Sequence, residues 1–141
     1  MTEEVFYPIE RAEKMIAGFT NCTLPLDEWD HGTHLVVGLY VIAKYGEAAY
    51  SVMKTRLLNY TKHYGKDGYH ETMTRFWIWA VQHFMEVENG SIAWNQTQLD
   101  AIIFNEELTR RNLWNDYYSL ELMQSEEAKK KFIEPDLKPL T

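Results

Sequence analysis

Apolar residues recur every three or four positions along most of the chain, the spacing that places them on one face of an α-helix. The first such stripe comprises Ile9, Ala12, Met15, Ile16 and Phe19. It predicts a helix over residues 9–19, and the polar, proline-terminated segment 20–25 breaks that helix. The same spacing predicts five further helices, over residues 27–45, 47–64, 70–87, 99–111 and 125–133.

Residues suited to helix ends mark several of these boundaries. Asp27 or Asp30 can cap the second helix, Gly46 can end it, and Ser125 can cap the last. No stretch of four to eight residues alternates between apolar and polar positions, so the pattern predicts no β-strand. We therefore expect an all-α fold, a single-domain bundle of four or five helices over residues 1–141.

The last residues break the helical pattern. Pro135 and Pro139 exclude a helix over residues 134–140. Leu137 and Leu140 in the same segment are apolar. We expect the C-terminal tail to be extended and to pack back on the bundle through these two leucines.

Composition narrows the possible functions. The chain of 141 residues has 21 Asp and Glu against 14 Lys and Arg, a net charge of −7. A nucleic-acid binder needs a basic surface, so we expect no nucleic-acid partner. The longest apolar run, from Leu35 to Ala43, is too short to cross a bilayer, and the start of the chain lacks the basic and apolar segments of a signal peptide. With Cys22 as the only cysteine, these features favour a cytoplasmic protein.

Three of the five histidines offer the most specific chemistry. His31 and His34 project about 60° apart on their predicted helix, on the side of its apolar stripe. His70 begins the stripe that continues through Thr74 and Trp77. All three imidazoles are therefore expected to point inward near helix starts, where they could converge on one divalent transition metal such as Zn, Fe or Ni.

Carboxylates stand close to these histidines in the sequence. Glu28 precedes His31 by three residues, and Glu71 follows His70 directly. Either carboxylate can serve as a catalytic base or as an additional metal ligand. The residues expected to line such a pocket are Trp29, Tyr69, Thr74 and Trp77.

A structural interpretation of the histidines stands beside the metal site. A buried histidine is usually hydrogen-bonded within the core, and a histidine at a helix start can cap its own first turn. His63, beside a glycine turn, and His83, which projects away from His70, are expected to take no part in the site.

Several stretches of the sequence are distinctive when taken together. They are residues 19–25 (FTNCTLP), the W-x-H-x-x-H-L block from Trp29 to Leu35, the G-Y-H-E-T block from Gly68 to Thr72, and residues 134–140 (EPDLKPL). With them the chain resembles, from Phe19 to Leu140, a family of small uncharacterised bacterial helical proteins that carries both blocks. The resemblance implies no particular reaction, but it selects His31, His34, His70 and Glu71. A similarity in fold alone is to the DinB-like helical bundles, which hold a metal with three histidines at a different spacing.

Two functions of different classes follow. In the first, the protein is a metal-dependent enzyme, a hydrolase or an oxygenase, that acts on a small-molecule substrate through His31, His34 and His70. In the second, the histidines are structural, and the protein is a non-catalytic helical module that forms a homodimer or binds a partner.

Overall fold

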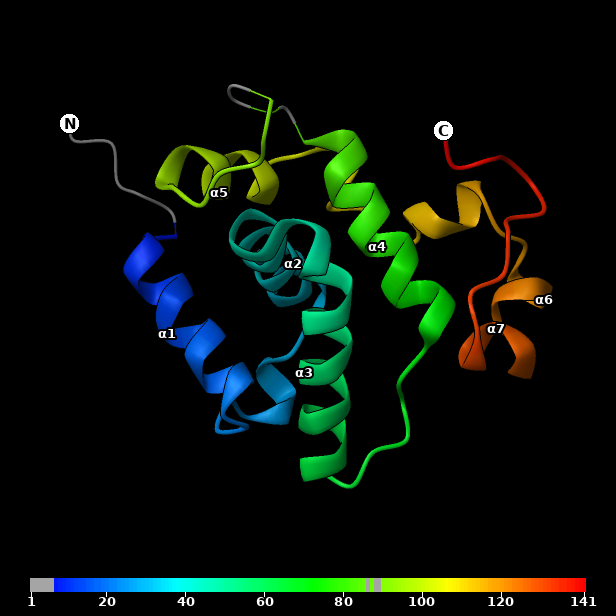
Figure 1. Cartoon of the computed structure of the whole chain (residues 1–141), viewed down its shortest axis with the longest axis horizontal. Helices are drawn as coiled ribbons and strands as arrows, with labels where there is room; N and C mark the ends of the chain where they lie inside the picture. The colour runs from blue at the N-terminus through cyan, green and yellow to red at the C-terminus, as the bar shows by residue number, and fades with distance from the viewer. Residues whose placement is uncertain (1–6, 86, 88–89) are drawn as a thin grey trace.

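The structure is a computed structural model that describes residues 7–85, 87 and 90–141 (Figure 1). In these residues the chain forms seven α-helices and three short 3-10 helices, and no β-strand. The α-helices are α1 (Ile9–Thr20), α2 (His31–Tyr45), α3 (Ala49–His63), α4 (Glu71–Phe84), α5 (Gln96–Ile103), α6 (Leu120–Met123) and α7 (Glu126–Lys130). The 3-10 helices are η1 (Leu26–Glu28), η2 (Gly46–Ala48) and η3 (Leu113–Asp116). The predicted all-α fold is confirmed. The first residues of the chain, on which the expectation of no signal peptide rests, lie outside the described part.

Helix α2 is the centre of the bundle. It packs against α3, α4 and α5, while α1 packs against α3 and α7 packs against α4. Figure 1 shows α2 in the middle with α1 and α4 on either side of it, and α6 and α7 beyond α4. The buried apolar residues of α2 are Leu35, Val36, Val37, Leu39, Val41 and Ile42. Because they cover every side of the helix rather than one stripe, α2 is stable only when other helices surround it.

Several helix boundaries follow the capping residues expected from the sequence. Of the two candidate caps for α2 the structure uses Asp30, whose carboxylate accepts a hydrogen bond of 2.8 Å from the Thr33 amide. The preceding residues form η1 instead of extending the helix. Gly46 ends α2 with a φ of 54°, a conformation that glycine adopts without steric cost. Ser125 caps α7 as expected, through the Ala128 amide.

The helix predicted over residues 99–111 is wrong in both of its boundaries. Helix α5 begins at Gln96, where the Asn95 side chain accepts a hydrogen bond from the Gln98 amide, and it ends at Ile103. Beyond it, the Asn105 side chain accepts hydrogen bonds from the Glu107 and Leu108 amides. This local turn competes with the helix, so residues 104–111 are irregular.

The C-terminal tail packs back on the bundle in extended form. The amide of Leu137 donates to the Tyr117 carbonyl at 2.9 Å, and the Asp136 carboxylate accepts from the amide and hydroxyl of Ser119. Leu140 is partly buried against the core, as expected. Leu137 is 56% exposed, so main-chain and polar contacts hold this part of the tail rather than the leucine side chain.

No helix in the described residues is long and apolar enough to span a membrane. The longest α-helices, α2 and α3, have 15 residues each, whereas a bilayer crossing needs about 20.

Candidate functional site

His31 opens helix α2 and ties it to the irregular segment after α5. Its Nε2 donates a hydrogen bond of 2.8 Å to the main-chain carbonyl of Leu108. The ring also packs edge-on against Trp77 of α4, with the ring centroids 4.7 Å apart. The imidazole is therefore partly buried as expected, but one of its nitrogens is occupied by a main-chain acceptor.

His70 caps helix α4 and ties it to helix α6. Its Nδ1 accepts a hydrogen bond of 3.1 Å from the Met73 amide, and its Nε2 donates one of 2.7 Å to the Met123 carbonyl. An amide can only donate and a carbonyl can only accept, so this pair of contacts requires the neutral imidazole with its proton on Nε2. Both ring nitrogens are thus engaged within the protein.

His34 lies one turn into α2, and its ring packs against Trp29 with the centroids 5.6 Å apart. Burial, with a smaller effect from the neighbouring His31, lowers the pKa of His34 to about 4. The imidazole is therefore neutral at physiological pH. A neutral histidine is the form that binds metals, but it is also the form that a buried aromatic cluster requires.

The structure does not bring the three histidines together. His31 contacts Trp77, which lies seven residues beyond His70 on α4, a rise of about 10 Å along the helix. Among residues 7–85, 87 and 90–141, no three His, Cys, Asp or Glu side chains are placed so that they could hold a metal ion. The predicted site of His31, His34 and His70 is therefore not assembled in this structure. His63 and His83, which are expected to take no part in the site, are both exposed.

Two substitutions at His70 separate its two contacts. His70→Asn keeps a good capping residue but loses the bond to Met123, so we expect the free energy of unfolding to fall by about 1 kcal/mol. His70→Ala loses both contacts and should cost about 2 kcal/mol. Urea unfolding of both variants measures the difference. An asparagine variant as unstable as the alanine variant would contradict a capping role.

Glu71 is a buried carboxylate that is surrounded by four side-chain donors. Tyr69 donates to Oε1 at 2.7 Å, and Lys54 Nζ lies 3.2 Å from the same oxygen. Oε2 accepts from the Tyr50 hydroxyl and from Arg75 Nε at 3.0 Å. Burial by itself would raise the pKa of the carboxyl, but the four donors outweigh burial and lower the pKa of Glu71 to about 2. A carboxylate held ionised in this way is a poor proton acceptor at neutral pH, so the geometry does not support Glu71 as a catalytic base.

The four residues expected around a metal pocket make core contacts instead. Trp29 stacks on Phe19 with the ring centroids 4.5 Å apart, and the Thr74 hydroxyl donates to the His70 carbonyl. Tyr69 donates to Glu71, and Trp77 packs on His31. These contacts connect the four side chains to their neighbours in α1, α2 and α4.

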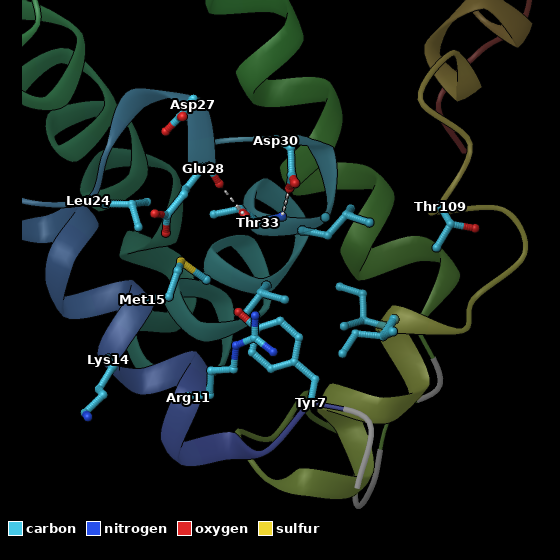
Figure 2. A pocket seen from close by; sticks show the side chains of 15 residues that line it. Tyr7, Arg11, Lys14, Met15, Leu24, Asp27, Glu28, Asp30, Thr33 and Thr109 are labelled. Carbon is cyan, nitrogen blue, oxygen red and sulfur yellow. Dashed lines mark hydrogen bonds between the residues drawn. The ribbon is translucent and has the colours of Figure 1, made fainter.

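A pocket of about 680 Å³ lies on another face of the bundle, between α1, η1, the start of α2 and the end of α5 (Figure 2). Its apolar lining consists of Met15, Leu24, Leu35, Val36, Ile102 and Ile103. Its charged and polar lining consists of Tyr7, Arg11, Lys14, Asp27, Glu28, Asp30, Thr33 and Thr109. Glu28, predicted as a metal ligand or base, belongs to this pocket and not to a histidine site.

Sequence reasoning missed this pocket because its walls come from segments that are distant in the chain. Arg11 and Met15 are one turn apart on α1, and they face residues of α2 and α5. On the sequence alone, Arg11 belongs to the polar face of an amphipathic helix. No local motif distinguishes such a residue from an ordinary solvated arginine.

Comparisons of the chain with models of protein families, with curated proteins and with solved structures found no match. The resemblance to a family with W-x-H-x-x-H-L and G-Y-H-E-T blocks therefore stays a prediction, and function has to be argued from the geometry.

Proposed function

We propose that this protein is a small-molecule-binding helical module and that its ligand occupies the pocket between α1, η1, α2 and α5. The observation that carries the proposal is the pocket itself. Its volume of about 680 Å³ lies within the range of about 300–1,000 Å³ that is usual for ligand sites.

The lining of the pocket supports this proposal. Six apolar side chains from three separate helices and one loop line it together with eight charged or polar side chains. In a ligand site the apolar part of the lining gives affinity and the polar part fixes the orientation of the ligand, and this pocket offers both. The contacts of the histidines support it indirectly, since His31 and His70 already have partners that stabilise the fold.

A metal-dependent enzyme built on His31, His34 and His70 is the competing proposal, and the contacts above do not favour it. Elemental analysis of the purified protein compares the two proposals directly. Stoichiometric Zn, Fe or Ni that is lost in the His34→Ala variant would favour the enzyme. No bound metal would leave the pocket as the better candidate site.

Gly32 offers a way to fill the pocket without disturbing the fold. It lines the pocket near the start of α2, and a Cβ built on it would meet only Asp30 Oδ1, at 3.5 Å. A Cβ at position 32 is therefore accommodated, and the ring of a Gly32→Phe variant is expected to extend into the pocket and cover its apolar floor. Gly68 is the matched control, because a Cβ there meets nothing within 4 Å and Gly68 is not among the residues that line the pocket.

The probe is 8-anilinonaphthalene-1-sulfonate, an aromatic anion whose fluorescence rises in apolar surroundings. We expect it to bind the wild-type protein and the Gly68→Phe variant alike, and to bind the Gly32→Phe variant at least tenfold more weakly. Equal binding to all three proteins, or no binding to the wild type, would contradict the proposed site.

A further inference from the structure

We propose that the ligand of this pocket is a dipolar molecule with an apolar body, an anionic group at one end that binds Arg11 and a cationic group at the other that binds Glu28. This inference rests on the proposed function, because it names the class of molecule that the same pocket takes. Four observations carry it: the position of each of the two charged groups, the separation between them, and the apolar floor.

The anion-binding end is Arg11 on α1. Its guanidinium lies over the Tyr7 ring, with Cζ 4.9 Å from the ring centroid, so the side chain is held at the pocket. Among the described residues Arg11 makes no ion pair. Figure 2 shows the guanidinium among the pocket side chains, whereas Lys14 extends away from them. A guanidinium in such a position suits a carboxylate, sulfonate or phosphate group.

The cation-binding end is Glu28 at the end of η1. Figure 2 shows its side chain extending from η1 toward Met15 and the pocket. Its carboxylate makes no ion pair with another described residue, whereas its main chain is engaged: the carbonyl accepts from the Thr33 hydroxyl at 3.0 Å and the amide donates to the Pro25 carbonyl at 3.0 Å. Asp30 is less suited to a ligand, because its carboxylate already caps α2.

Both charges act on the same space. The Tyr7 phenol lines the pocket, and burial raises its pKa. The positive charge of Arg11 opposes that rise, while the negative charges of Asp30 and Glu28 add to it. Positive and negative side chains therefore both affect the Tyr7 phenol. Arg11 and Glu28 nevertheless do not form an ion pair with each other, because their charged groups are too far apart.

The separation of the charges excludes ligands that carry both groups on one atom. In Figure 2 Met15 lies between Arg11 and Glu28, and Met15 is one turn from Arg11 along α1, a rise of about 6 Å. A molecule that reaches both must carry its charges at opposite ends of a body several atoms long. That body lies over apolar residues such as Leu35 and Val36. A ligand with only one charge would leave the opposite charge of the pocket without a partner.

Straight-chain ω-amino acids are the simplest probes of this kind. The test measures by calorimetry at pH 7 the affinities of 4-aminobutanoate, 6-aminohexanoate and 8-aminooctanoate, and of the amine and the acid that match each chain length. We expect at least one ω-amino acid to bind at least tenfold more tightly than both of its singly charged analogues. Equal affinities within every length class would overturn the inference.

Two substitutions test which residue binds which charged end of the ligand. Arg11→Gln should remove the advantage of the ω-amino acid over the matching amine, and Glu28→Gln should remove its advantage over the matching acid. Glu10→Gln and Lys62→Gln are controls, because both side chains are exposed, neither lines the pocket, and they remove the same charges. An advantage that survives both pocket substitutions would also overturn the inference.

Failure of this inference is distinguishable from failure of the proposed function. If Gly32→Phe weakens binding of 8-anilinonaphthalene-1-sulfonate but no ω-amino acid is preferred, the pocket is a ligand site and the dipolar class is wrong. If Gly32→Phe has no effect on that dye, the pocket is not the site, and a preference for ω-amino acids would then have to come from elsewhere.

Discussion

Replacing Glu71 with alanine should lower the free energy of unfolding by about 3 kcal/mol or more. The substitution removes the acceptor of four donors at once, and a buried charge pair that loses one partner typically costs about 3–5 kcal/mol. Because Lys54 and Arg75 are 40% and 46% exposed, water can solvate both cations, which places the expected loss at the lower end. Urea unfolding followed by far-UV circular dichroism measures it.

Glu127→Ala is the matched control for this prediction. Glu127 also pairs with a basic residue four positions later, Lys131, at 3.1 Å, but the two side chains are 62% and 65% exposed. Surface pairs of this kind contribute about 0–1 kcal/mol. Tyr50 and Lys54 lie on α3, whereas Glu71 is on α4. If the two alanine variants lose the same stability, these contacts of Glu71 do not stabilise the packing of α3 against α4.

The second large effect is a loss of stability in mild acid caused by His34. Its pKa falls from 6.5 to about 4 on folding, so the unfolded chain binds the proton more tightly than the folded protein does. The stability that the neutral ring contributes is therefore complete above pH 6.5 and is lost as the pH falls toward 4. Between pH 7.5 and pH 4.5 this linkage amounts to roughly 2–3 kcal/mol.

Unfolding by urea at pH 7.5, 6.0 and 4.5 measures this dependence. The His34→Gln variant should show a flatter profile over that range, whereas the exposed His63→Gln variant should follow the wild type. The carboxyl of Glu71, with its pKa of about 2, loses its contribution at lower pH and does not account for a change above pH 4.5. A His34→Gln profile as steep as that of the wild type would contradict the assignment.

The helices were predictable from the sequence wherever local signals agree. For α1, apolar spacing and the polar break after it coincide, and the helix ends within one residue of the expected position. For α2, Asp30 and Gly46 supply both ends. The segment 104–111 was not predictable in this way, because the helical spacing continues there while the Asn105 side chain forms a competing turn. The sequence pattern alone does not determine whether the helix or the Asn105 turn forms.

In the candidate site, the direction of the histidine side chains was predictable from the sequence, but their hydrogen-bond partners were not. Helical projection correctly indicates that His31, His34 and His70 point inward, since all three are partly buried. It does not indicate what they meet there. The partners of His31 and His70 are main-chain carbonyls at Leu108 and Met123, 77 and 53 residues away in the chain. A carbonyl is present at every residue, so nothing in the sequence marks these two as acceptors.

The use of main-chain acceptors has a consequence for how this chain can change in evolution. Any amino acid at positions 108 and 123 presents the same carbonyl, so those side chains are free to vary as far as these two bonds are concerned. His70 is not free, because few other side chains can reach a distant carbonyl and cap a helix start at the same time, and His31 is not free, because it reaches its carbonyl while its ring packs on Trp77. Related sequences would then retain His31 and His70 while the residue types at positions 108 and 123 vary. Metal-binding histidines would be retained in the same way. Invariance of these histidines would therefore be no argument for a metal.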